Sequence, residues 1–311
     1  MHQAFIVIAA VLWGLDGLLR SKLYAVQPAV VVFGEHIIGL VLLSLIIVLK
    51  RHPIDLSGFT KKMLFAALFV SLFSGLIGTL AFTSALARVN YIPFSIVFLI
   101  QKIQPLFTIS AAYVFLREKP SKYFFVWALV AISAGIFMTF PGGHVTIDPQ
   151  SPYTIAAGLA LIAAISWGVS TIFSRYLLQR KSMVTVTFIR FALTAMITGV
   201  VVLASGSQNV LLTLSSDQYV SLGLIACSTG MVALLIYYKG LQHVPAHISC
   251  ILELAFPITG LVIDAVHGAY LLPSQYVAAL VMVIAMYRVV RQQKADKRTS
   301  QTIINPRPLT S

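Results

Sequence analysis

Ionisable side chains interrupt several long apolar runs of this sequence. The charged residues inside such runs are Asp16, Glu35, Lys102, Arg190, Glu253 and Asp264. A charge in the hydrocarbon core of a bilayer is costly, so it is expected to face protein or water and to be paired or functional. These residues are therefore candidates for binding a ligand, an ion or a proton.

Acids and bases occupy corresponding helices of the two halves of the chain. Counted from the ends of the apolar runs, Glu35 and Lys102 lie at similar depth towards one side of a membrane. Arg190 and Glu253 lie at similar depth towards the other side. We expect each couple to pair. Two interpretations stay open: structural ion pairs that neutralise buried charge, or groups that flank a cavity and bind a zwitterion or act as gates.

Proton binding is a further possibility at Glu35 and the adjacent His36. A buried carboxyl group and a histidine can both change charge near neutral pH. Asp16 lies four residues before Arg20, and a simple pair between them competes with any functional role for Asp16.

Aromatic residues form a second set of candidates. Trp13 and Trp167 lie in the middle of apolar runs, where a role in the interfacial aromatic belt does not explain them. They either face lipid, pack in the protein interior or line a cavity. Tyr238, with its neighbour Tyr237, could offer a hydroxyl to a substrate, although a tyrosine near the end of a span is also typical of the belt.

Amides and prolines lie beside two of the charges. Gln101 and Gln104 flank Lys102 and are candidates for substrate binding. Pro105 follows Lys102, and Pro257 follows Glu253. Each proline frees a backbone carbonyl and bends its helix, so each is a candidate hinge, with a static kink as the alternative.

Composition predicts an all-α integral membrane protein. The chain has 311 residues, of which 59% are hydrophobic and 10% charged, whereas soluble proteins carry roughly 25% charged residues. The net charge of +13 is spread over loops, which favours the positive-inside rule over nucleic-acid binding. Cys227 and Cys250 have no metal-ligand spacing, and we expect no disulfide, metal or cofactor. The N-terminal run lacks the features of a cleaved signal peptide.

Apolar runs predict ten transmembrane helices. They cover residues 3–20, 28–49, 63–86, 93–116, 122–140, 153–175, 183–204, 218–239, 246–267 and 272–290. Most lysines and arginines lie in the loops after the even-numbered helices or in the tail. By the positive-inside rule, we expect a multi-pass protein of the cell (inner) membrane with both termini in the cytoplasm. The polar tail, residues 291–311, is expected to be disordered.

The ten helices divide into two repeats. Pro93 and Pro245, like Pro105 and Pro257, are separated by the same 152 residues. We expect a first five-helix repeat at 1–140, an external linker at 141–152 and a second repeat at 153–290. An odd number of helices per repeat inverts the second against the first, an arrangement typical of transporters with a site near the midplane.

Taken together, these features resemble the drug/metabolite transporter superfamily, EamA-like type. Similar features are the Trp-Gly of two equivalent helices (Trp13-Gly14 and Trp167-Gly168) and the proline-opened fourth helix of each repeat, VNYIPFS and HVPAHIS. The sequence departs from the pattern where Ala269-Tyr270-Leu271 stands in the place of Arg117-Glu118-Lys119. The resemblance implies transport of small metabolites, often amino acids or related compounds, and favours an interior position for Trp13 and Trp167.

We therefore expect a secondary transporter that moves a small polar metabolite, with an amino acid or related zwitterion favoured. A phosphate-binding loop of the G-x-x-x-x-G-K-[ST] type is absent from the sequence, as are the G-x-S-x-G and H-E-x-x-H motifs of hydrolases. The alternatives are a channel or lipid scramblase on the same fold and, less favoured, an integral membrane enzyme. The substrate, the bilayer and a coupling proton are the expected partners, and the sequence leaves the oligomeric state open.

Overall fold

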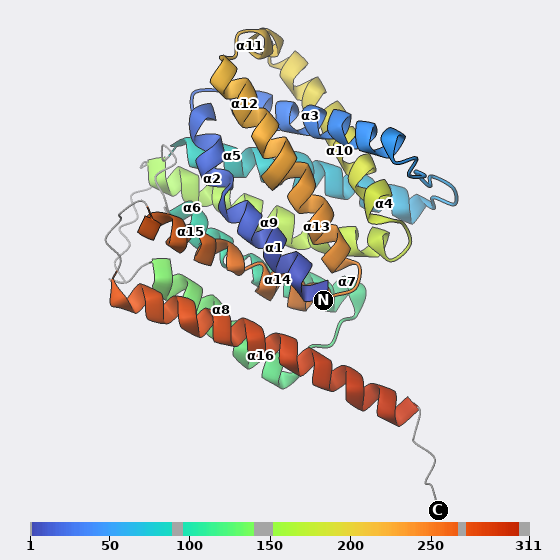
Figure 1. The fold of residues 1–311 in the computed structure, drawn as a ribbon, viewed down its shortest axis with the longest axis vertical. Coiled ribbons are helices and arrows are strands. Elements are labelled where there is room, and N and C mark those ends of the chain that lie inside the picture. The colour runs from blue at the N-terminus through green and yellow to red at the C-terminus, as the bar shows by residue number, and fades with distance from the viewer. Residues whose placement is uncertain (1, 89–95, 140–151, 267–271, 305–311) are drawn as a thin grey trace, which may run out of the picture.

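The computed structural model describes residues 2–88, 96–139, 152–266 and 272–304, and within them it is built of helices (Figure 1). The first half contains α1 (His2–Gly14), α2 (Asp16–Arg20), η1 (Ser21–Leu23), α3 (Pro28–Leu49), α4 (Lys61–Phe69), η2 (Val70–Gly78), α5 (Thr79–Arg88), α6 (Ile96–Gln101), α7 (Gln104–Leu116) and α8 (Lys122–Thr139). The second half contains α9 (Pro152–Leu178), α10 (Met183–Ala204), α11 (Gln208–Leu212), α12 (Ser216–Ile225), η3 (Ala226–Gly230), α13 (Met231–Leu241), α14 (Ala246–Leu252), α15 (Ala255–Val266) and α16 (Pro273–Ile304).

Most of these helices match the predicted spans. Within the described part of the chain, 8 helical segments of at least 18 residues are apolar enough to cross a membrane. Two shorter apolar helices, Gln104–Leu116 and Lys122–Met138, account for the remaining predicted spans. The all-α membrane fold predicted from composition is confirmed.

The fourth helix of each repeat, predicted at 93–116 and 246–267 with a bend at its proline, is interrupted for two residues shortly before that proline. Helix α6 ends at Gln101 and α7 begins at Gln104, while α14 ends at Leu252 and α15 begins at Ala255. Pro105 and Pro257 each lie in the first turn of the second segment. A proline has no N–H to donate and clashes with the preceding turn, but it is well tolerated at a helix start. The interruption therefore lies where the prolines predicted a bend.

Helix contacts repeat between the halves. Helix α1 packs on α13 and α15, and α9, its equivalent in the second half, packs on α5 and α7. Helices α3 and α10 are equivalent and pack on each other, as do α8 and α16, which lie side by side at one edge of the molecule (Figure 1). The contacts named here thus have counterparts under exchange of the halves, as two inverted repeats require.

The third helix of each repeat carries a π-helical segment, η2 or η3, at equivalent positions. Gly75 in η2 and Gly230 in η3 are separated by 155 residues. A Cβ atom at Gly75 would lie 2.0 Å from Thr194 Oγ1, so α10 approaches the η2 backbone closely here. Such π segments occur frequently at functional sites.

We expect Gly75→Ala to lower stability by about 1–3 kcal/mol, the usual cost of overpacking. The added methyl group would force Thr194 and α10 away from η2. Gly223→Ala is the matched control, because a Cβ atom there meets nothing within 4 Å. Thermal unfolding of the purified variants in detergent measures the difference. Equal midpoints for the two variants would contradict the close packing.

The C-terminal region is helical further than expected. Helix α16 continues to Ile304, so the expectation of a disordered tail from residue 291 is wrong for the described part. Between Pro273 and Pro306 the sequence contains no glycine or proline that would end the helix. The predicted linker at 141–152 lies almost wholly outside the described residues.

One end of the bundle, which we call the basic end, gathers the loops at 50–60, 117–121, 179–182 and 242–245. Lys181 Nζ lies 2.6 Å from Asp55 Oδ2. The rings of His2 and His243 lie 4.0 Å apart. Both contacts join the first half of the chain to the second. The basic loops thus meet at one end, as the predicted topology requires.

Candidate functional site

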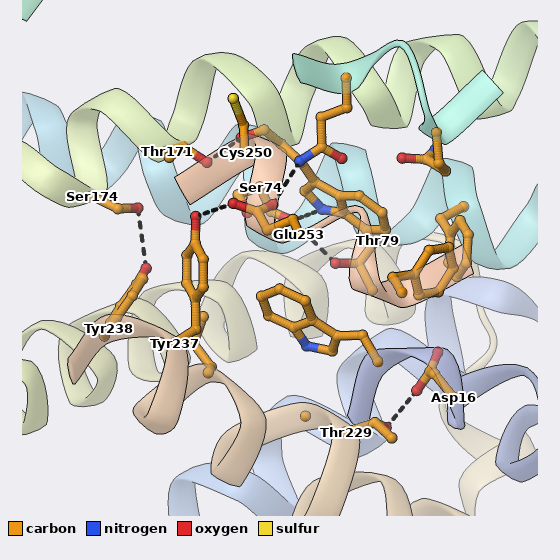
Figure 2. A pocket seen from close by; sticks show the side chains of 18 of the residues that line it. Asp16, Ser74, Thr79, Thr171, Ser174, Thr229, Tyr237, Tyr238, Cys250 and Glu253 are labelled. Carbon is orange, nitrogen blue, oxygen red and sulfur yellow. Dashed lines mark hydrogen bonds between the residues drawn. The ribbon is translucent and has the colours of Figure 1, made fainter. Parts of the chain in front are cut away.

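A cavity of about 200 Å³ lies between the two halves. All of the predicted binding, gating and hinge residues line it: Trp13, Glu35, His36, Gln101, Lys102, Gln104, Pro105, Trp167, Arg190, Tyr238, Glu253 and Pro257. They come from seven predicted spans that are far apart in the sequence. The cavity is therefore the candidate substrate site (Figure 2).

A first polar network surrounds Arg20. Its guanidinium group forms an ion pair with Asp16 and lies 2.5 Å from Glu35 Oε2. It also donates a hydrogen bond of 3.3 Å to Thr83. Thr229 in η3 donates to the other oxygen of Asp16 at 2.5 Å (Figure 2). Arg20 is only 5% exposed, so two buried carboxylates share a buried cation.

A second polar network surrounds Arg190 in α10. Its Nη1 donates to the Tyr238 hydroxyl at 3.0 Å, and its Nη2 donates to Ser74 Oγ at 2.8 Å. The hydroxyls of Tyr238 and Ser174 lie 3.1 Å apart (Figure 2). Buried Arg190 Nε has no hydrogen-bond partner among the described residues.

The two networks are equivalent under exchange of the repeats. At separations of 154 or 155 residues, the corresponding pairs are Asp16 and Ser170, Arg20 and Ser174, Glu35 and Arg190, Ser74 and Thr229, and Thr83 and Tyr238. The contact of Arg20 with Thr83 thus corresponds to that of Ser174 with Tyr238. The same framework carries two acids and one base on one side of the cavity and one base on the other.

The predicted ion pairs are wrong. Glu35 pairs with Arg20 rather than Lys102, and Lys102 Nζ donates to the Gly135 carbonyl of α8 at 2.8 Å. Arg190 and Glu253 bind different tyrosines rather than each other. The depths were estimated along straight helices, whereas the break after Gln101 turns Lys102 towards α8. The simpler prediction, a pair between Asp16 and Arg20, is confirmed.

His36 lies beside Glu35 but does not hydrogen-bond to it. Its Nδ1 donates to the Val32 carbonyl at 2.7 Å and is 3.5 Å from Glu35 Oε1. The ring also packs 5.0 Å from the ring of Phe191. The imidazole is thus anchored on its own helix, and its role in proton binding stays a prediction.

The side chain of Asp264 lies outside the described residues.

Glu253 lies at the break between α14 and α15, within a shell of neutral donors. Tyr237 donates to its carboxyl group at 2.6 Å, and Ser249 donates at 3.2 Å. From the first half of the chain, Gln104 Nε2 donates at 3.2 Å. Among the described residues, no lysine, arginine or histidine lies within 4.0 Å of this carboxyl group. Figure 2 shows Tyr237 pointing at Glu253.

Two equivalent aromatic pairs line the cavity. The ring centroids of Trp13 and Tyr237 lie 5.0 Å apart, with the ring planes inclined by 56°. Those of Trp167 and Phe82 lie 5.1 Å apart, inclined by 53°. Trp167 Nε1 also donates to the Ser74 carbonyl at 3.1 Å. The prediction that the tryptophans face the interior is correct.

Gln101 is the position equivalent to Glu253 in the first half, at the end of α6. Its Nε2 donates to the Ala160 carbonyl at 2.9 Å, and its buried Oε1 has no hydrogen-bond partner among the described residues. Pro105 and Pro257 adjoin the two breaks, but whether they act as hinges stays a prediction.

Sequence reasoning missed part of the site. Arg20 was expected only as a partner of Asp16, and its contacts with Glu35 and Thr83 were not predicted. Ser74 and Thr229 gave no signal as isolated hydroxyl residues, and only their equivalent places in the repeats relate them.

Among the described residues, no group of three or more histidine, cysteine, aspartate or glutamate side chains could hold a metal ion.

Comparison with known proteins agrees with this architecture. The profile of the EamA-like transporter family matches residues 2–140 and again residues 154–291. The chain belongs to the EamA-like transporter family. A curated relative, "Riboflavin transporter ImpX" of Fusobacterium nucleatum subsp. nucleatum (strain ATCC 23726 / VPI 4351), is 32% identical over 287 residues, 91% of this chain and 95% of its own length.

A solved structure shares the EamA fold. The structure, described as "Crystal structure of protein", has a TM-score of 0.72 with 17% identity, over 93% of this chain and 98% of its own. At that identity the likeness shows the fold alone. Family membership makes this chain a multi-pass membrane transporter of small molecules.

Proposed function

We propose that this protein is a secondary transporter that moves a planar, uncharged metabolite of the flavin type, with riboflavin as the first compound to test. Both termini lie in the cytoplasm and the basic end faces it. The cavity between the repeats holds the substrate and opens to each side in turn. The named activity of the curated relative supports this substrate class.

The charge of the cavity supports a substrate without net charge. Its lining carries three acidic residues, Asp16, Glu35 and Glu253, and three basic residues, Arg20, Lys102 and Arg190. When all six are ionised the charges cancel. A substrate with a net charge would have to be desolvated without a compensating charge in the wall, which is costly. A neutral molecule or a zwitterion avoids that cost.

The observation that carries the proposal is the two equivalent aromatic pairs, Trp13 with Tyr237 and Trp167 with Phe82. A flavin ring system is flat and aromatic, and aromatic side chains stabilise such surfaces by stacking and edge contacts. The edge of that ring offers both donors and acceptors. Gln101 Oε1 and Arg190 Nε, which have no hydrogen-bond partner within the described part of the chain, supply an acceptor and a donor in the same wall.

Alternating access is supported by contacts that join the two halves at the basic end. Glu118 in the first half accepts hydrogen bonds from the backbone N–H groups of Ala246 and His247 at 3.0 and 3.2 Å. It also pairs with the His247 ring and lies 3.1 Å from Arg175 Nε. Burial alone would raise the pKa of Glu118, but these donors hold it below its usual range. Opening to the cytoplasm would require these contacts to separate.

Counterflow in proteoliposomes tests the substrate. Vesicles loaded with unlabelled riboflavin should take up labelled riboflavin, and Trp13→Ala should reduce the initial rate about tenfold, since one stacking surface is lost. Trp127→Ala is the matched control: Trp127 lies on α8 against Arg288 and does not line the cavity. Equal rates for the two variants would contradict the aromatic site.

The same vesicles distinguish the alternatives. A zwitterionic amino acid remains the second candidate, because Glu253 and Arg190 both line the cavity. Counterflow of amino acids without that of riboflavin would favour it and overturn the flavin proposal. Without an imposed gradient, uptake that only equilibrates and shows no transient accumulation in the counterflow assay would indicate a channel. Movement of labelled phospholipid between leaflets would indicate a scramblase.

A further inference from the structure

We propose that Glu253 is the binding site of a coupling proton, which links substrate movement to a proton gradient. The inference rests on the proposed transport function. The proton joins a carboxylate oxygen from water on one side of the membrane and returns to water on the other. No other bond forms or breaks.

The shell of Glu253 can satisfy either form of the carboxyl group. A carboxylate accepts hydrogen bonds only, whereas a carboxylic acid must also donate one. Hydroxyl groups and amides can do both, by rotating an O–H bond or presenting the amide oxygen. Two hydroxyls, of Tyr237 and Ser249, and the amide of Gln104 surround Glu253. Ser249 and Tyr237 are also 3.1 Å apart, so the two hydroxyls can reorient together.

The other acids of the cavity are held differently. Asp16 and Glu35 both contact the guanidinium group of Arg20. A guanidinium group donates hydrogen bonds but cannot accept one, so it suits a carboxylate and cannot take the proton of an acid. Of the three acids in the cavity wall, Glu253 is the one whose hydrogen-bond partners among the described residues are all neutral.

Charged and titratable groups around Glu253 are few. Tyr237 of α13 and Cys250 of α14 are the titratable neighbours, and Gln104 of α7 contributes an uncharged amide. Trp13 of α1 packs on the ring of Tyr237. Within the described residues, no cation is in ion-pair contact to hold Glu253 in one form. A buried carboxyl group of this kind in a membrane protein is typical of proton pathways.

Glu253 also lies at a contact between the two halves of the chain. It separates α14 from α15, and Gln104 begins α7 in the other repeat. Their hydrogen bond crosses between the halves at the cavity wall. A change of charge on Glu253 therefore alters a contact between the two parts that must move relative to each other. This position couples proton binding to alternating access.

The variant Glu253→Gln tests the inference. Glutamine mimics the protonated acid, and the equivalent position already holds Gln101, so the fold accepts an amide there. In proteoliposomes, wild-type protein should concentrate riboflavin about tenfold under an imposed gradient of one pH unit. Glu253→Gln should lose gradient-driven accumulation of riboflavin, and any riboflavin counterflow that it retains should not depend on pH, unlike that of wild type. Glu253→Gln that still concentrates riboflavin would overturn the inference.

The experiments distinguish a wrong substrate proposal from a wrong proton-site proposal. Absence of riboflavin counterflow by wild-type protein overturns the substrate, whereas counterflow without any effect of the gradient overturns the proton site alone. Should Glu253→Gln fail to fold, riboflavin binding to wild-type protein in weakly buffered detergent provides a second measurement. About one proton should be taken up or released per riboflavin bound, and Tyr237→Phe should shift the pH at which this exchange is largest. Binding without proton exchange would contradict the proposal.

Discussion

Arg20→Gln should lower the free energy of unfolding by about 3–5 kcal/mol, the usual cost of removing one partner from a buried ion pair. Without the guanidinium group, Asp16 and Glu35 would face each other as buried acids. Because many proteins are stable by only about 5–15 kcal/mol, this loss is a large fraction of the total stability. Membrane abundance and the thermal midpoint in detergent measure the effect.

Two further variants make this prediction specific. Arg88→Gln removes the same charge from an exposed position at the end of α5 and should behave as wild type. The triple variant with Asp16→Asn, Arg20→Gln and Glu35→Gln removes all three charges and should recover most of the lost stability, since neutral groups are cheaper to bury. Unfolding of Arg20→Gln at the temperature of the Arg88→Gln control would contradict the central role of Arg20.

The sequence predicted the repeat and the residues of the cavity for a physical reason. A charge, an amide or an indole in the middle of an apolar span must avoid lipid. The interior of a ten-helix protein offers few other places, so these residues converge on the cavity. The duplicated sequence then relates Trp13 to Trp167 and Glu35 to Arg190, and the structure places each couple in equivalent surroundings.

The ion-pair partners of the buried charges could not be predicted, because depth along a helix does not determine the direction in which a side chain points. Lys102 and Glu35 have similar depth, but the break between α6 and α7 directs Lys102 to Gly135. The break itself could not be distinguished from a kink, because proline permits both. Short-range spacing was more informative: Asp16 and Arg20, four residues apart, do form a pair.

Residues at the basic end escaped prediction for a different reason. Glu118 was noted only as a place where the second repeat departs from the first, with Tyr270 in the equivalent position. Its partners Arg175 and His247 come from the other half and are distant in sequence. No periodicity relates such residues, so the contact became visible only in three dimensions.

That contact leads to the second large effect: Glu118→Ala should expose Cys250 to reagents from the cytoplasm. Cys250 lies one turn after His247, lines the cavity and is buried. Without Glu118, the start of α14 loses a cap for two N–H groups and Arg175 loses an ion-pair partner. The halves should then separate more often at the basic end, which in the proposed orientation faces the cytoplasm.

Maleimide labelling measures this opening. In a Cys227→Ser background, which removes the exposed cysteine, an impermeant maleimide applied to inside-out vesicles should label Cys250 about tenfold faster in Glu118→Ala, equivalent to about 1.4 kcal/mol. Asp217→Asn, which alters an exposed acid in α12, is the matched control. Unchanged labelling in Glu118→Ala would contradict a gate at this position.

The pH dependence of the same labelling adds a check. Because the pKa of Glu118 is held below its ordinary value of 4.5 by the His247 ring and the backbone N–H groups, despite burial, its contribution is complete above that value. The contribution is lost as the pH falls through the lowered pKa. Both labelling rates rise with pH because the thiolate is the reactive form of the cysteine, so the ratio of the variant rate to the wild-type rate is the quantity to compare. This ratio should be constant between about pH 6 and 8, since the Glu118 carboxylate is fully ionised throughout that range.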